Sequence, residues 1–177
     1  TKGHVAQVNE ARFAFGGQPD QAYTVSADGT LRRWRISTAE RSQEAVALAK
    51  DNKGKKAALT CLSVGEALVA TGCENGTVLL WSTKSPMARP QYTIDAHPAG
   101  EDAVTRCSLS PCGKFVLTRS ATDSSLALFD IRKPKQALWR VSDLMATHST
   151  TACGFAPPHS SLPPKEVPAS TIAPACD

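Results

Sequence analysis

One nine-residue segment recurs three times at a nearly constant pitch, and this repeat limits the possible folds more than any other feature. Its copies are Ser-Ala-Asp-Gly-Thr-Leu-Arg-Arg-Trp at 26–34, Cys-Glu-Asn-Gly-Thr-Val-Leu-Leu-Trp at 73–81 and Ala-Thr-Asp-Ser-Ser-Leu-Ala-Leu-Phe at 121–129. Repeats of this length are typical of solenoids and propellers, in which a single unit cannot bury its own faces. Neighbouring units must cover one another, so the repeat predicts a stack of similar units.

A tight turn and a closing aromatic residue mark every copy. The two positions lie 6 residues apart within each copy, and both return after 47 and then 48 residues. Asp-Gly or Asn-Gly between apolar runs indicates a hairpin, because glycine reaches positive φ at little cost. The turn residues are Asp28, Asn75 (followed by Gly76) and Asp123, and the closing aromatics are Trp34, Trp81 and Phe129.

Each unit is predicted to hold four short strands, two around the turn and one at either end. The strands before the turns are predicted at 22–26, 68–73 and 115–120, the first strands at 8–15, 58–63 and 104–110, and the fourth strands at 43–48, 91–94 and 137–141. The segment at 43–48 also suits a helical turn, since Ala-Val-Ala-Leu-Ala fits both. Short strands without amphipathic helices between them favour propeller blades over a parallel α/β sheet.

The chain therefore divides into three units and two terminal segments. Residues 1–50 are predicted to form blade one, 51–95 blade two and 96–143 blade three. Residues 144–156 are predicted to hold the first strand of a fourth blade, at Thr150–Phe155. The segment 157–177 contains Pro157, Pro158, Pro163, Pro164, Pro168 and Pro174. Because proline cannot donate a ladder hydrogen bond, this segment is predicted to be a disordered tail or insertion.

Composition argues against several classes of function. The net charge is only +4 and the basic residues are scattered, which gives weak support to nucleic-acid binding. No apolar stretch is long enough to span a bilayer, and without a signal peptide we expect a reducing compartment. No C-x-x-C pair or phosphate-binding loop occurs, so neither a metal nor a cofactor is expected. The cysteines are Cys61, Cys73, Cys107, Cys112, Cys153 and Cys176.

The ends of the units carry a family resemblance. Gly3-His4 opens the first unit, Ala96-His97 opens the third, and Phe129-Asp130 stands where a Trp-Asp pair closes such a unit. Together with the repeat, these residues resemble the WD-repeat family, whose units are β-propeller blades. Seven blades at this pitch need more than about 300 residues. We therefore expect an all-β fold, a partial WD-repeat β-propeller with three four-stranded blades and the start of a fourth, as a fragment of a seven-bladed ring.

Several stretches are also similar, in order and spacing, to the nuclear WD-repeat proteins of the gastrulation-defective group. They are Gly54-Lys55-Lys56, the Asn75-Gly76 turn with Trp81, Ala96-His97, Asp130-Ile131-Arg132 and Thr151–Phe155. This resemblance implies a nuclear location, with the cytoplasm as the alternative. It also implies protein partners rather than a membrane or a small-molecule substrate.

His4, Ser26 and Asp28 have two interpretations. Serine, histidine and aspartate can form a hydrolase triad, but the sequence shows neither a nucleophile elbow nor an oxyanion hole. The resemblance implies instead a structural network in which these three side chains hydrogen-bond with Trp34 and satisfy buried polar groups. On that interpretation no catalytic residue is expected, and the chain is not an enzyme.

The other two units are predicted to carry parts of the same network. His97 and Asp123 form the equivalent pair in blade three. Blade two has Asn75 and Trp81 but no opening histidine, so its network is expected to be smaller. Glu101 and Asp102, in the loop before the first strand of blade three, are predicted to be solvated.

Three features are candidates for partner binding. Asp130-Ile131-Arg132 resembles the Trp-Asp-x-Arg pattern of substrate receptors for cullin ubiquitin ligases, in which the arginine meets the adaptor; a common repeat ending is the alternative. Arg33 and Arg35 share one strand face and predict a basic patch for an acidic partner or a solvated edge. Met87 is predicted to be exposed between two prolines, as a peptide contact or an inert linker.

These features lead to one main function and two alternatives. The main hypothesis is a non-catalytic protein-interaction scaffold in the nucleus. Its sharper form is a substrate receptor for a cullin ubiquitin ligase in chromatin or DNA-repair regulation. The first alternative is a nucleic-acid- or chromatin-associated propeller of RNA processing, which would use Lys53, Lys55, Lys56 and the strand Arg32–Arg35. The second alternative is the serine hydrolase built on Ser26.

Overall fold

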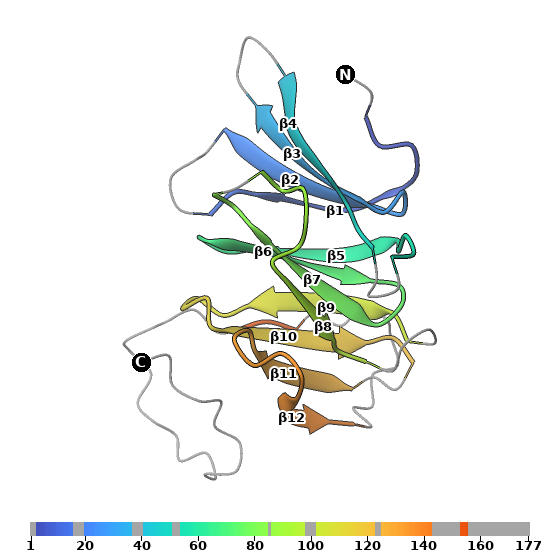
Figure 1. Ribbon diagram of the computed structural model, residues 1–177, viewed down its shortest axis with the longest axis vertical. Helices are drawn as coiled ribbons and strands as arrows, with labels where there is room; N and C mark the ends of the chain where they lie inside the picture. Colours follow the sequence, from blue (N-terminus) through green and yellow to red (C-terminus); the bar gives the residue numbers. More distant parts are fainter. Residues whose placement is uncertain are drawn as a thin grey trace.

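Three four-stranded antiparallel sheets contain all the named strands in the described part of the chain. In the computed structural model, the described residues are 3–15, 20–36, 41–50, 54–84, 86–97, 102–122, 125–142 and 153–155. The sheets stack one on another along the longest axis of the molecule (Figure 1). Within these ranges no helix is long and apolar enough to cross a membrane. The architecture is the all-β, partial propeller that the repeat predicts.

Every sheet is a meander whose strands follow chain order. Blade one contains β1 (Val8–Phe13), β2 (Gln21–Ser26), β3 (Thr30–Ile36) and β4 (Arg41–Leu48). Blade two contains β5 (Leu59–Val64), β6 (Leu68–Cys73), β7 (Thr77–Ser82) and β8 (Tyr92–Asp95). Blade three contains β9 (Val104–Leu109), β10 (Phe115–Ser120), β11 (Leu126–Asp130) and β12 (Ala137–Val141). Because antiparallel neighbours are joined by short turns, the hydrogen-bond ladders of each blade connect strands that are consecutive in the sequence.

The strand predictions differ from the structure mainly at the ends. The ambiguous segment at 43–48 lies within β4, so the strand interpretation is correct and the helical one is wrong. β1 ends at Phe13, two residues before its predicted end. Of the strand predicted at 150–155, only Cys153–Phe155 is described, and these residues carry no strand. The segment 157–177 lies outside the described residues.

The hairpin turns use the predicted asparagine, aspartate and glycine chemistry. Gly29 and Gly76 have φ values of 70° and 82°, a region that side chains with a Cβ rarely enter. Asp28 Oδ1 accepts the backbone N–H of Thr30 at 2.9 Å, so the aspartate side chain stabilises the turn by binding a backbone donor two residues on. A Cβ on Gly29 would lie 2.8 Å from the carbonyl oxygen of Ala57, because the chain entering blade two runs directly over this turn.

The first apolar core lies between blade one and blade two. Blade one contributes Tyr23, Val25 and Leu31, each no more than 1% exposed, and blade two contributes a set that includes Val69 and Trp81, both fully buried. In β7 every residue from Thr77 to Trp81 is buried, because neighbouring blades cover both faces of its sheet. Alternation of buried and exposed residues is therefore lost in the middle blade, as expected for a sheet enclosed on both sides.

The second apolar core joins blade two to blade three. On the face of blade two that points toward blade three, Val78, Leu80 and Ile94 are buried. They form one cluster with Val104 and Phe129 of blade three, and all five are no more than 2% exposed. Phe129 is thus the counterpart of Trp81, since each closing aromatic packs against the blade before it. The fixed pitch of the aromatic in the sequence marks one blade-to-blade contact per repeat.

The two end faces of the stack differ in how far their apolar side chains are buried. The outer face of blade one leaves large side chains open, with Phe13 69% exposed and Ile36 44% exposed. On the opposite end, Leu117 and Leu128 of blade three are buried, and Cys153 and Phe155 pack against their cluster. Cys153 and Phe155 therefore lie on the face where a further blade would pack.

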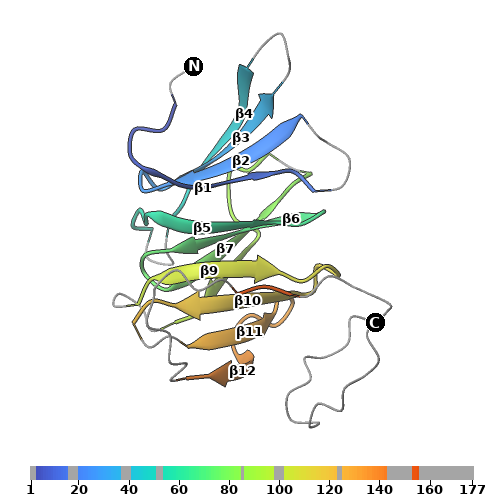
Figure 2. The ribbon, with the colours of Figure 1, turned by 180° about the vertical axis from the view of Figure 1, so that it is seen from behind.

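β1, β5 and β9, the first strands of the three blades, lie side by side along one edge of the stack (Figure 2). Close approach at this edge depends on Gly72. A Cβ at this position would lie 2.5 Å from Cys61 Sγ and 2.8 Å from Val104 Cγ1, so no larger residue fits without movement. The first strand of blade three can approach the middle blade because this side chain is absent.

Candidate functional site

A hydrogen-bond network ties the loop before blade one to the strands of that blade. His4 Nδ1 lies 3.0 Å from Asp28 Oδ2, and His4 Nε2 lies 2.7 Å from Thr24 Oγ1. Trp34 Nε1 donates to the same threonine oxygen at 2.8 Å. The Thr24 hydroxyl therefore has its own proton to donate to His4 Nε2, while His4 Nδ1–H donates to Asp28. This assigns the tautomer of His4 from its partners.

Asp28 is 4% exposed and remains the anionic end of this network. Burial alone raises its carboxyl pKa, but hydrogen bonds from the Thr30 hydroxyl, the backbone N–H of Val5 and His4 outweigh burial and hold that pKa well below its ordinary value. The shortest of these contacts joins Thr30 Oγ1 to Asp28 Oδ1 at 2.6 Å. A carboxylate with this many donors serves as an anchor for the loop around His4.

Ser26 does not occupy the position in the network that the sequence analysis gave it. Its Oγ donates to the carbonyl oxygen of Ala6 at 3.2 Å and accepts the backbone N–H of Asp28 at 3.0 Å. The hydroxyl that bridges His4 and Trp34 belongs to Thr24 instead. The geometry gives the hydrolase hypothesis no support, because the hydroxyl of Ser26 has no hydrogen bond to a base that could accept its proton.

Blade two has the smaller network expected from its missing histidine. Trp81 Nε1 donates to Thr71 Oγ1 at 3.0 Å, and both side chains are fully buried. The Thr71 hydroxyl donates onward to the carbonyl oxygen of Leu79 at 3.4 Å. At the turn, Asn75 Oδ1 accepts from the hydroxyl of Thr77 at 2.8 Å. The turn and the aromatic thus form separate hydrogen bonds, and no side chain among the described residues links them.

Blade three keeps the histidine but reverses its hydrogen-bond direction. Thr118 Oγ1 donates to the carbonyl oxygen of Ala127 at 3.3 Å, so it accepts from His97 Nε2 at 3.1 Å. Arg140 Nη1 then donates to His97 Nδ1 at 3.1 Å. The reversal follows from Phe129, which has no indole N–H to give to the threonine. In blade three, His97 therefore gives Thr118 the hydrogen bond that a tryptophan indole gives the threonine of the other two blades.

The predicted pair of His97 and Asp123 stays a prediction, because Asp123 lies outside the described residues. Arg140 is a partner of His97 that sequence reasoning missed, and its Nη2 also donates to the carbonyl oxygen of Ala96 at 2.6 Å. Arg140 comes from β12, the outermost strand of blade three, so it ties that strand to the loop before the blade.

Sequence reasoning also missed a threonine at the centre of every network. These residues are Thr24, Thr71 and Thr118, and they stand 47 residues apart. The turn residues and the closing aromatics return after 47 and 48 residues, nearly the same pitch, so the signal was available. It was overlooked because threonine is common in strands and carries no motif by itself.

The Asp130-Ile131-Arg132 segment forms a turn at the end of β11. Asp130 Oδ1 accepts the backbone N–H of Arg132 at 2.8 Å, and Arg132 Nη2 lies 3.4 Å from Asp130 Oδ2. The bond from the Arg132 backbone and the neighbouring guanidinium lower the pKa of the Asp130 carboxyl. Ile131 is 3% exposed and joins the second core, whereas the side chain of Arg132 is 70% exposed. The segment thus presents one arginine to solvent from an anchored turn.

Arg33 and Arg35 are less available than a basic patch requires. Both guanidiniums pair with Glu44, with Arg33 Nε 3.1 Å from Oε2 and Arg35 Nε 2.7 Å from Oε1. Arg33 also donates to the carbonyl oxygen of Thr83 in blade two at 3.2 Å, and its side chain is only 20% exposed. These arginines line the junction of blades one and two. In the predicted lysine cluster, Lys55 and Lys56 are exposed, and Lys53 lies outside the described residues.

Two predictions about exposure are wrong. Met87 is 2% exposed and packs in the first core, because the loop after β7 folds back over the face that carries Trp81. Asp102 is 4% exposed: its Oδ2 accepts from the Ser120 hydroxyl, and its Oδ1 accepts the backbone N–H of Thr122 at 2.8 Å. Prolines around the methionine and a loop position for the aspartate suggested solvent, but tertiary packing places both inside.

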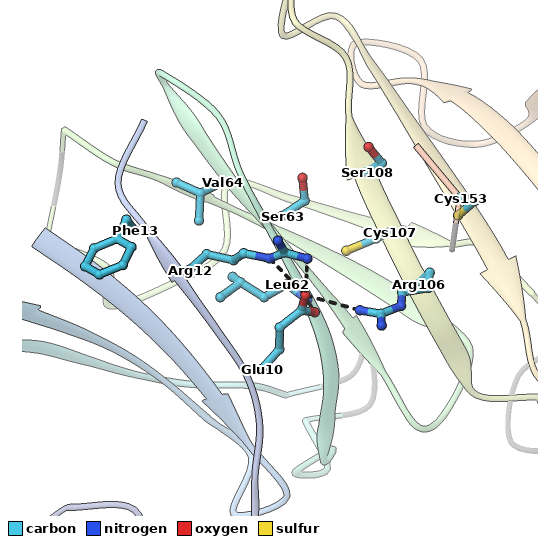
Figure 3. Close-up of a pocket in the computed structure, with 10 residues that line it drawn as sticks. All are labelled: Glu10, Arg12, Phe13, Leu62, Ser63, Val64, Arg106, Cys107, Ser108 and Cys153. Atoms are coloured by element: carbon cyan, nitrogen blue, oxygen red, sulfur yellow. Dashed lines mark hydrogen bonds and ion pairs between the residues drawn. The ribbon is translucent and has the colours of Figure 1, made fainter. Parts of the chain in front are cut away.

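One polar pocket among the described residues lies where the three first strands meet. We call it the inner pocket, and it has a volume of about 330 Å³ (Figure 3). β1 contributes Glu10, Arg12 and Phe13, while β5 and β9 contribute three residues each, among them Arg106. Cys153, from the segment after blade three, completes the lining. All three blades therefore build one surface that no single repeat contains.

Glu10 is the centre of the inner pocket (Figure 3). Its Oε1 accepts from Arg12 Nη2 at 2.6 Å, from Arg12 Nε at 2.9 Å and from Arg106 Nη1 at 3.2 Å. Its Oε2 accepts the backbone N–H of Leu62 at 2.8 Å. One carboxylate thus connects a residue of blade one to the backbone of blade two and a side chain of blade three.

Two thiols line this pocket: Cys107 is buried and Cys153 is half-buried. The hydrogen bond with Cys61 and burial raise the pKa of the Cys107 thiol, and burial raises that of Cys153. A protonated thiol is a weak nucleophile and a poor metal ligand. Among the described residues, no group of three or more His, Cys, Asp or Glu side chains could hold a metal ion. The chemistry of the inner pocket is therefore that of its charged groups and of Phe13.

Stacked four-stranded meanders, with a histidine, threonine, turn carboxylate and tryptophan joined in one network, define a propeller built of WD repeats. Comparison with known families agrees with this class: residues 49–82 and 88–130 match the family model described as WD domain, G-beta repeat. The chain therefore contains WD repeats. The sequence-based assignment to that family is confirmed.

Individual relatives lie within the group that the sequence resembles. The chain is 31% identical over 159 residues to the gastrulation defective protein 1 homolog of Drosophila melanogaster, an overlap of 89% of this chain and 24% of that protein. It is 32% identical over 160 residues to WD repeat-containing protein 70 of Xenopus tropicalis, covering 89% and 25% respectively. The Bos taurus protein of the same name is 28% identical over 159 residues, covering 89% and 24%. The chain spans about a quarter of the length of these relatives.

Proposed function

We propose that this protein is a non-catalytic scaffold that binds other proteins through surfaces held on its stacked blades. The observation that carries the proposal is how the polar side chains are used. The constellation that resembled a catalytic triad is engaged in internal hydrogen bonds, with Ser26 fully buried and Asp28 4% exposed. Charged side chains such as Arg132, 70% exposed, instead project from anchored turns and strands. Polar groups on a rigid frame are suited to recognition.

The sharper form of this proposal is a nuclear substrate receptor for a cullin ubiquitin ligase. Support comes from the likeness of Asp130-Ile131-Arg132 to the adaptor-binding pattern and from the turn that fixes Asp130 while Arg132 reaches solvent. A single exposed arginine on a buried anchor is a suitable interface residue, since arginine is enriched at binding hot spots. The nuclear location is supported by the resemblance to the gastrulation-defective group alone.

Affinity purification from nuclear extract tests the adaptor contact. The tagged protein is expected to recover the cullin adaptor, and Arg132→Ala is expected to reduce that recovery about tenfold. Arg89→Ala is the matched control, because Arg89 is also an exposed arginine and follows the corresponding strand of blade two. Equal recovery by wild type and Arg132→Ala, with the adaptor present, rejects this site. A fluorescent fusion that stays in the cytoplasm rejects the nuclear location.

A further inference from the structure

We propose that the inner pocket binds a peptide segment through an acidic side chain, with Arg12 and Arg106 as the recognition pair and Phe13 as an apolar contact. The proposal deepens the scaffold function and rests on it. It names the chemistry of one partner and the residues that would bind that partner. The residues come from the first strands of blades one and three, which meet at the same edge of the stack.

The first argument concerns which charges reach solvent. Glu10 is only 11% exposed, whereas Arg12 is 57% and Arg106 is 37% exposed. The pocket lining contains two cations and one anion, two minus one, which leaves a net charge of +1. Because the anion is the buried member, a ligand at the mouth of the pocket meets guanidinium groups first. An anionic ligand is therefore favoured over a cationic one.

The second argument concerns unused hydrogen-bond donors. A carboxylate accepts about four hydrogen bonds, and Glu10 already receives four, from Arg12 (two), Arg106 and the backbone of Leu62. Each guanidinium carries about five N–H donors. Among the described residues, Arg12 gives two of its donors to Glu10 and Arg106 gives one. The remaining donors are preorganised by Glu10, and a second carboxylate is the group that matches them.

The third argument selects a peptide as the occupant. Phe13 is 69% exposed on the outer face of blade one and also lines the inner pocket, so an apolar side chain stands at the rim of the charged surface. The pocket volume of about 330 Å³ is enough for one or two side chains but not for a large ligand. An aspartate or glutamate beside an apolar residue in an extended segment matches both parts. A nucleic-acid backbone would present its charges as a row of phosphates, whereas the net charge of +1 at the inner pocket matches a single anionic group.

Fluorescence anisotropy with the full chain tests this binding. The probe is a short fluorescein-labelled peptide with adjacent Leu and Glu residues in a Gly-Ser background, and the control peptide has Gln in place of Glu. We expect saturable binding of the Glu peptide alone, weakened about tenfold by either Arg12→Gln or Arg106→Gln. Arg89→Gln removes the same charge from an exposed arginine outside the inner pocket and is expected to leave peptide binding unchanged. Thermal unfolding of each variant checks that it is folded.

Glu10→Gln gives a test with the opposite sign. This change removes the internal competitor and raises the pocket charge from +1 to +2, so the Glu peptide is expected to bind several-fold more tightly in about 50 mM salt. If the variant fails to fold, the two arginine variants still decide the question.

Several outcomes overturn the proposal. They are equal binding of the Glu and Gln peptides, equal losses in all three arginine variants, and no binding by a folded wild-type chain. Binding of a single-stranded oligothymidine that depends on Arg12 and Arg106, without peptide binding, also overturns it in favour of nucleic acid. Adaptor recovery through Arg132 is measured separately, so failure here leaves the scaffold function standing.

Discussion

Replacing Thr71 with valine is expected to destabilise the chain through one lost hydrogen-bond acceptor. Thr71 Oγ1 accepts from Trp81 Nε1 at 3.0 Å, and both side chains are fully buried. Valine keeps the shape of threonine but lacks the hydroxyl, so the core volume is preserved while the indole N–H is left without a partner. Water cannot replace the hydroxyl at a buried position, and the expected loss is about 1–3 kcal/mol in the free energy of unfolding.

Urea unfolding followed by circular dichroism and tryptophan fluorescence measures this loss. For a chain of this size, each kcal/mol corresponds to a fall of roughly 2–4 °C in melting temperature. Thr71→Ser is the matched control: it keeps the hydroxyl and removes one methyl group, so it separates the acceptor from packing. A Thr71→Val chain as stable as wild type, or more stable than Thr71→Ser, would refute the role given to the hydroxyl.

Three further changes test other parts of the structure. Gly72→Ala places a Cβ 2.5 Å from Cys61 Sγ and is expected to cost about 1–3 kcal/mol, part of which Cys61→Ala should restore in urea unfolding of the double mutant. Met87→Ala is expected to cost about 2–5 kcal/mol by the same assay, whereas an exposed methionine would cost under about 0.5 kcal/mol. Asp28→Asn is expected to lower stability above about pH 5. Because the folded carboxyl has the lower pKa, its stabilisation is lost as pH falls, and the two stability curves should converge in acid.

The blade architecture could be predicted because its signals are local. A turn such as Asn75-Gly76 between two apolar runs specifies a hairpin within a few residues, and the fixed pitch then repeats it. The segment at 43–48 was ambiguous for the same reason: five small apolar residues carry no period that separates strand from helix. Its pairing with β3, which aligns Leu31 with Ala47, makes it a strand, and that pairing is a tertiary contact.

The site could be predicted only in part, since its contacts join distant strands. Thr24 and Ser26 lie on the same face of β2, and sequence alone does not tell which hydroxyl reaches His4. The pairing of Glu44 with Arg33 and Arg35 depends on the register between β3 and β4. Glu10 carried no motif at all, because its partners stand 52 and 96 residues away.

Glu10 also shows why binding and stability are hard to separate in a propeller. A recognition surface formed by several blades keeps its shape only if the blades keep their spacing. Here the carboxylate that accepts the Leu62 backbone N–H also holds the Arg106 guanidinium, so one side chain sets both the spacing and the charge of the inner pocket. A substitution that only loosened the blades would weaken every ligand, whereas the neutral, same-sized glutamine should strengthen an acidic one. The sign of the change in affinity, measured beside the change in stability, distinguishes these two effects.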